Sequence, residues 1–199
     1  SVVGEATTGR IGHHFDGVLA SARWEPGEGL QRVSAQAGYF RNSDFGSVLG
    51  EPKTARPFLA QYRYNVAPTR TYLEATAGQF MNNDTGVQFG MRQWFSDLSV
   101  GVYYRRSKFS NAAARSFVGM ELSIPIGPRR DMDPRGVQVT GTPRFAHSVN
   151  TVVGNTTNNV VGGYGVLPPA PSLETTFNSD RAGLLYFEDN IRRIRDAAR

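Results

Sequence analysis

The sequence predicts an all-β fold, and more narrowly a segment of an antiparallel transmembrane β-barrel. Three observations predict it: apolar and polar residues alternate, the alternating segments run about 9–11 residues, and aromatic residues gather at segment ends. Residues 98–108 ("LSVGVYYRRSK") show the alternation. In a β-strand, successive side chains point to opposite faces, so the apolar residues would lie on one face and the residues between them on the other. This pattern alone fits a soluble sheet with a buried apolar face and a barrel with an apolar face in lipid.

The alternation recurs along the first two thirds of the chain. It predicts seven strands, at residues 15–24, 30–40, 58–65, 71–80, 86–94, 98–108 and 116–126, and an eighth if residues 1–8 also form one. Strands in globular proteins are usually about 5–6 residues long, whereas about 9–11 residues are needed to cross a bilayer at a tilt. Segment length therefore favours a barrel of about seven or eight strands in residues 1–126.

Aromatic residues near strand termini are typical of the girdles that flank the lipid-facing band of a barrel. The residues expected in such girdles are Trp24, Tyr39, Tyr62, Tyr64, Trp94 and Tyr104. Antiparallel sandwiches also carry aromatics at strand ends, so a soluble glycan-binding β-sandwich remains the alternative from another structural class.

Connection lengths predict an orientation. The short connections "EPGEG", "VAPTR" and "FSD" alternate with "RNSDFGSVLGEPKTAR", "MNND" and "SKFSNAAA", two of which are clearly longer. Outer-membrane barrels have short periplasmic turns and longer outer loops. We therefore expect residues 41–56 outside the cell and the end of the last strand, Ile126, on the periplasmic side.

Residues 127–199 are expected to form a periplasmic extension. It would contain short strands at 137–140 and 144–153, a linker rich in Gly, Asn and Pro, and a helix over 179–198 with Ser179 as its N-cap. Apolar residues at helical spacing draw a stripe that covers either the same chain or a partner protein. The residues assigned to partner binding are Leu184, Phe187, Ile191 and Ile194.

Composition limits the chemistry. The 199 residues include no Cys, and the net charge of +5 comes from arginines spread over several strands, which does not predict nucleic-acid binding. No phosphate-binding loop, dinucleotide fingerprint or nucleophile elbow occurs in the sequence. We therefore expect no enzymatic activity, catalytic residue, cofactor or metal site. A polysaccharide-modifying enzyme is the remaining alternative, because Glu74 and Glu121 are carboxylates on the same face.

The polar face of the predicted strands is the better candidate for function. Guanidinium groups bind carboxylates in a bidentate manner, so arginines among amides and carboxylates suit an acidic glycan. The alternative is that these arginines and carboxylates pair with one another inside the barrel. The expected lumen-facing, ligand-binding residues are Arg32, Arg63, Arg92, Arg105, Gln61, Gln88, Glu74 and Glu121.

The stretches "IPIGPRRDMDP", "VQVTGTPRF" and "SDRAGLLYFEDNIRRIRDAAR" give residues 116–199 a resemblance to the YjbH-like family of Gram-negative exopolysaccharide and capsule proteins. The resemblance implies the C-terminal part of an outer-membrane β-barrel protein, often a lipoprotein, although this chain has no Cys to carry the lipid. It implies export or assembly of an exopolysaccharide or capsule. The partners implied are outer-membrane lipid, the polysaccharide and periplasmic proteins of the same export system.

Overall fold

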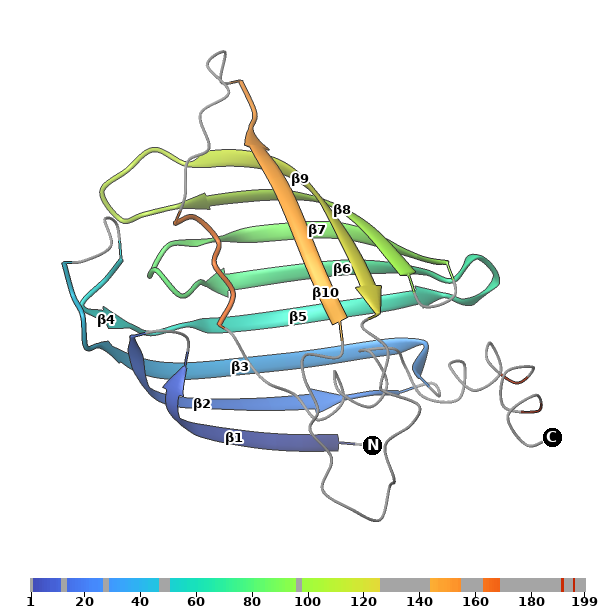
Figure 1. Cartoon of the computed structure of the whole chain (residues 1–199), viewed down its shortest axis with the longest axis horizontal. Helices are drawn as coiled ribbons and strands as arrows, with labels where there is room; N and C mark the ends of the chain where they lie inside the picture. Colours follow the sequence, from blue (N-terminus) through green and yellow to red (C-terminus); the bar gives the residue numbers. More distant parts are fainter. Residues whose placement is uncertain are drawn as a thin grey trace.

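The strands form one antiparallel sheet (Figure 1). The computed structural model describes residues 2–11, 14–26, 29–46, 51–95, 98–125, 144–154 and 163–168, together with Ile191 and Arg195. The strands are β1 (Val2–Ile11), β2 (Phe15–Trp24), β3 (Gln31–Asn42), β4 (Thr54–Ala55), β5 (Phe58–Val66), β6 (Thr71–Gln79), β7 (Thr85–Phe95), β8 (Leu98–Lys108), β9 (Arg115–Pro125) and β10 (Arg144–Val152). Sequence neighbours pair along the path β1-β2-β3-β5-β6-β7-β8-β9-β10, and the two-residue β4 adds to β3.

The antiparallel all-β prediction is confirmed, and the described sheet has ten strands where seven or eight were predicted for the barrel segment. Each of the seven alternating segments is a strand, and β1 is the eighth. The structure adds β4, inside the loop expected at 41–56. The strand expected at 144–153 is present as β10, and it pairs with β9 over nine residues. The sheet therefore includes a strand from residues 127–199, which we expected to form an extension separate from the barrel strands. The reason is that β10 hydrogen-bonds to the edge that β9 would otherwise leave open.

Helix is scarce in the described residues: a 3-10 turn at Ala67–Thr69, the 3-10 residue Gly29, and the helical residues Ile191 and Arg195. The remainder of the helix expected at 179–198 lies outside the described residues, as does the strand expected at 137–140. No helix in the part of the chain that the structure describes has the length and apolarity to cross a bilayer.

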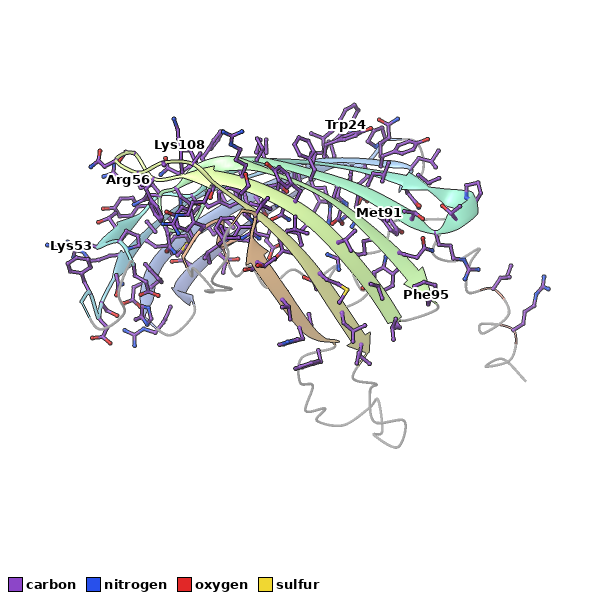
Figure 2. All side chains as sticks on the ribbon, turned by 90° about the horizontal axis from the view of Figure 1, so that it is seen from above. Trp24, Lys53, Arg56, Met91, Phe95 and Lys108 are labelled. Atoms are coloured by element: carbon purple, nitrogen blue, oxygen red, sulfur yellow. The ribbon has the colours of Figure 1, made fainter. Side chains whose placement is uncertain are left out.

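The sheet is curved but not closed. Viewed from above, it bends into a trough with a convex and a concave face (Figure 2). Strands β1 and β10 are its two edges and do not pair with each other. The described residues therefore form an open sheet and not a complete barrel.

The convex face carries many large apolar side chains and leaves them exposed. Neighbouring strands place Met91, Val102 and Met120 side by side, with exposed fractions of 46%, 44% and 55%. Five of the six predicted girdle residues are exposed large aromatics, namely Trp24, Tyr39, Tyr62, Tyr64 and Tyr104. The prediction for Trp94 is wrong, because alternation from Met91 turns its side chain to the concave face, where it is buried; Phe95 is the exposed aromatic there.

An apolar core fills one end of the concave face. It consists of Phe15, Leu19, Phe40, Ala55 and Met81, contributed by β2, β3, β4 and the β6–β7 turn. Asn83 holds β4 to that turn. Its side-chain Nδ2 donates to the backbone carbonyl of Thr54 (2.7 Å), and its Oδ1 accepts from the backbone amide of Arg56 (2.9 Å). A polar cavity occupies the part of the trough beyond this core.

Candidate functional site

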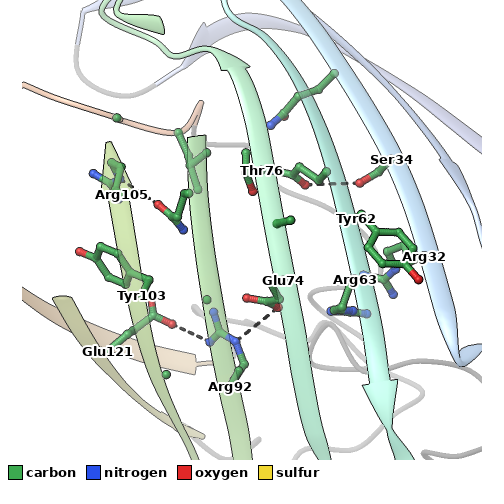
Figure 3. Close-up of a pocket in the computed structure, with 18 of the residues that line it drawn as sticks. Arg32, Ser34, Tyr62, Arg63, Glu74, Thr76, Arg92, Tyr103, Arg105 and Glu121 are labelled. Atoms are coloured by element: carbon green, nitrogen blue, oxygen red, sulfur yellow. Dashed lines mark hydrogen bonds and ion pairs between the residues drawn. The ribbon is translucent and has the colours of Figure 1, made fainter. Parts of the chain in front are cut away.

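The concave face holds a polar cavity of about 660 Å³ (Figure 3). The alternation predicted eight residues on this face, and the structure places all eight in the lining of this one cavity. They are Arg32, Arg63, Arg92, Arg105, Gln61, Gln88, Glu74 and Glu121. Their placement is thus established, and their binding of a ligand stays a prediction.

Strand register brings the predicted residues into adjacent positions. Arg32, Arg63 and Glu74 lie opposite one another on β3, β5 and β6. A second row across β5 to β8 consists of residues that are register partners in turn: Gln61, Thr76, Gln88 and Arg105. The cavity wall therefore consists of rows of polar side chains that run from strand to strand.

One arginine bridges the two glutamates that the enzyme alternative requires. Arg92 donates from Nη1 to Oε1 of Glu121 at 2.6 Å, and its Nε lies 3.7 Å from Oε1 of Glu74 (Figure 3). Arg32 donates to Glu25, a residue just after β2 that the polar-face pattern missed. Arg92 and Arg32 therefore pair with glutamates of the same sheet or its turns, as the alternative to glycan binding predicts.

The other two predicted arginines lie over aromatic rings. The guanidinium of Arg63 is 4.8 Å from the ring centroid of Tyr72, and that of Arg105 is 5.0 Å from the ring of Tyr103. A guanidinium on a ring presents a flat surface with charge at its edge, which suits a sugar ring with a carboxylate. Neither tyrosine was among the predicted site residues.

Tyr103 lies flat across a neighbouring glycine. A Cβ at Gly119 would come within 2.3 Å of the tyrosine ring, so only glycine leaves room for this ring position. Asn150 on β10 donates to the Tyr103 hydroxyl at 3.2 Å. An aromatic residue on the polar side of an alternating strand is the signal that could have found Tyr103 in the sequence.

A segment far along the chain closes part of the cavity. Residues 163–168, which we expected to be linker, contribute lining residues, and the backbone carbonyl of Tyr164 accepts from Arg105 Nη1 at 2.8 Å. The Tyr164 ring packs edge-on against Phe109, with centroids 4.7 Å apart. Gly165 is required here because its φ is +63° and a Cβ would lie 2.2 Å from the Arg105 side chain.

A buried carboxylate holds this segment to the sheet. Asp84 is fully buried, and its Oδ2 accepts from the amide of Gly165 at 2.7 Å. Burial raises the pKa of Asp84 above its ordinary value of 3.8, and the hydrogen bond from Gly165 acts in the opposite direction. The Met81 amide donates to the Val166 carbonyl at 2.8 Å, and Asn82 Nδ2 donates to the Gly163 carbonyl at 2.8 Å. Together with Asp84, the β6–β7 turn therefore holds the segment at three points.

The cavity lining has a small excess of positive charge. Five arginines and three glutamates line it, a difference of two charges. Glu25 binds Arg32 from outside the lining and reduces this excess to one. The cavity therefore offers both anion-binding groups and neutral hydrogen-bonding groups. No group of three or more His, Cys, Asp or Glu side chains suited to a metal ion occurs among the described residues.

The predicted partner-binding stripe is almost wholly outside the described residues. Leu184, Phe187 and Ile194 are not described. Of the four residues, only Ile191 is described: it is helical and its side chain is 46% exposed.

Comparison with known proteins adds no relative. No family model, curated protein or solved structure matches the chain. The resemblance to the YjbH-like family therefore stays a prediction, and the functional argument depends on the geometry of the sheet.

Proposed function

We propose that the sheet is part of the wall of an outer-membrane β-barrel, with its convex face in lipid and its concave face toward the lumen. The observation that carries the proposal is the reversed distribution of side chains. Large apolar residues are exposed across the convex face, whereas Arg32, Arg63 and Ser99 are buried on the concave face. Exposed apolar patches on soluble monomers rarely exceed a few hundred Å², and this one extends from β2 to β10.

Strand length and loop position supply the orientation of this proposal. The strands other than β4 have 9–12 residues, which suits a tilted crossing of the hydrocarbon core. The loop between β3 and β5 is the long outer one, and the 3-10 turn at Ala67–Thr69 is periplasmic. The location proposed is the outer membrane of a Gram-negative cell, with the C-terminal segment in the periplasm.

The role proposed for the lumen is non-enzymatic export or assembly of an exopolysaccharide or capsule. Sugars bind to planar polar groups and aromatic faces, and acidic sugars also bind guanidinium groups. The cavity lining supplies these groups in Arg63, in Arg105 over Tyr103, and in the amide of Gln88. The proposed partners are lipid, the polysaccharide and periplasmic proteins of the same export system, the last bound by the stripe in residues 179–198.

The alternatives receive less support from the same geometry. A β-sandwich buries its apolar face against a second sheet, whereas all strands in the described part of the chain belong to one sheet. A glycoside hydrolase of the usual kind needs the substrate bond between its two carboxylates. In this cavity the Arg92 guanidinium lies between Glu74 and Glu121.

Two adjacent arginines allow a matched test of this role. Arg105 points into the cavity and Arg106 points to the exposed convex side. In the producing bacterium, Arg105→Gln should lower surface polysaccharide several-fold, and Arg106→Gln should not. Purified wild-type protein should bind oligomers of polygalacturonate more tightly than neutral dextran, and Arg105→Gln should remove this preference. Equal polysaccharide output from both variants, at equal amounts of protein in the membrane, would contradict the proposed role.

A further inference from the structure

The path of nine paired strands ends in two long open edges. Strand β1 pairs with β2 along all ten of its residues, and β10 pairs with β9 along all nine. The opposite side of each strand has no strand partner among the described residues. Each edge therefore presents a row of backbone donors and acceptors.

These edges lack most of the features that protect natural free edges; the inward-facing charge of Glu5 on β1 is the exception. Free edges are usually short, interrupted by a bulge, or marked by Lys or Pro. Neither β1 ("VVGEATTGRI") nor β10 ("RFAHSVNTV") contains Lys or Pro, and both keep an uninterrupted one-to-one register with their neighbour. The convex side chains Phe145 and Val149 on β10 are 54% and 60% exposed, like those of the inner strands. Both edges thus have the character of paired strands.

The hydrogen-bond pattern identifies the groups that point outward from β10. The Val153 amide donates to the Ser116 carbonyl at 2.8 Å, which continues the β9–β10 register by one residue. In an antiparallel ladder the bonded residues alternate, so the amides of His147 and Thr151 also face β9. The amides of Ser148 and Asn150 then face the open edge. Their side chains line the polar cavity, so a strand added here would extend both the ladder and the cavity wall.

Strand parity restricts what can be added. Every neighbouring pair on the path is antiparallel, so its first and ninth strands, β1 and β10, run in the same direction. A second copy inserted in the same orientation would therefore meet β1 with β10 in a parallel pair. Bacterial outer-membrane barrels are antiparallel and have an even number of strands. An odd number of further strands that alternate in direction from β10 to β1 satisfies both conditions. A second copy in the same orientation does not, because its first strand would run parallel to β10.

We infer that the β10 and β1 edges are bridged by a β-sheet element with an odd number of antiparallel strands, apolar toward lipid and polar toward the cavity, which is not a second copy of this sheet in the same orientation. The inference rests on the proposed membrane location, because lipid offers no water to satisfy an open edge. It explains why Glu5 on β1 and Ser148 on β10 both line the cavity, since the element would complete that wall.

Amide hydrogen exchange in the protein isolated from its own cells tests this inference. The amides of Ser148 and Asn150 should exchange with D₂O within about tenfold of the rates of His147 and Thr151, which are bonded to β9 and serve as internal references. Exchange of Ser148 and Asn150 more than a hundredfold faster would show an open edge and overturn the inference. Cross-strand Hα–Hα contacts at Val149 are expected from an antiparallel partner, and a parallel pattern would also overturn it.

The same preparation separates this inference from the proposed function. Recovery of the protein in the soluble fraction would contradict the membrane proposal, yet the exchange rates measured on that soluble protein would still report whether the edge is paired. A native mass corresponding to a homodimer joined through β1 and β10 would contradict the statement that the element is not a second copy in the same orientation.

Discussion

An arginine at Val102 should strongly destabilise the folded protein in a bilayer, whereas an arginine at Gly101 should not. Val102 is the fifth of eleven residues in β8, near the middle of the proposed crossing, and its side chain is 44% exposed between Met91 and Met120. Arginine on the lipid face near the midplane costs about 2–4 kcal/mol. At about 1.4 kcal/mol per tenfold, Val102→Arg should lower the folding equilibrium constant about 30-fold to 1,000-fold.

The adjacent position supplies the control. The nearest atom to a Cβ at Gly101 would be the Glu121 Cβ at 3.8 Å, so a side chain can start toward the cavity without a clash. Gly101→Arg would place its charge near the glutamates of the cavity wall. Denaturant titration of protein refolded into phospholipid vesicles measures both free energies of unfolding. Equal losses for the two variants, or a loss below about 0.5 kcal/mol for Val102→Arg, would refute the assignment of the convex face to lipid.

Three further predictions concern the loops, the buried carboxylate and the tail. A Cys at the exposed Asp44 should react with a membrane-impermeant thiol reagent on intact cells and a Cys at Pro68 should not; the reverse would invert the orientation. Because burial raises the pKa of Asp84, its contribution to the free energy of unfolding should be largest below pH 3.8 and should fall as pH rises through the higher folded-state pKa. Asp84→Asn should flatten that dependence in thermal melts, and an unchanged pH profile would exclude Asp84 as its source. Removal of residues 179–199 should lower polysaccharide output while the protein remains in the outer membrane; loss from the membrane would assign the tail to the folding unit.

The inward-facing residues could be predicted because alternation is a local property. Once a strand is recognised, each side chain is assigned to a face by its position, and this placed residues from Arg32 to Glu121 in one cavity. The same rule, applied consistently, would have placed Trp94 on the concave face. It was assigned to the girdle because it stands near a strand end, and position along a strand does not determine the face.

The pairing of these residues could not be predicted, because it depends on contacts between distant parts of the chain. The bridge from Arg92 to Glu74 and Glu121 joins β7 to β6 and β9, and it reaches β9 across β8 at Gly101, which is in register with both residues. The contact between Arg105 and the carbonyl of Tyr164 joins residues 59 positions apart. Composition indicated a linker around Tyr164, and a backbone carbonyl that serves as a ligand leaves no trace in side-chain pattern.

A spin-label scan of β9 tests the central claim most directly, namely that the convex face contacts lipid and the concave face contacts water. The chain has no Cys, so single cysteines placed at each position from 117 to 124 give unambiguous labels in vesicle-embedded protein. Collision with dissolved oxygen, which concentrates in lipid, should alternate with a period of two and peak at Val118, Met120, Leu122 and Ile124. Collision with a water-soluble nickel chelate should not peak at those positions. Maximal chelate access at the four apolar positions, or no alternation with oxygen, would contradict the account.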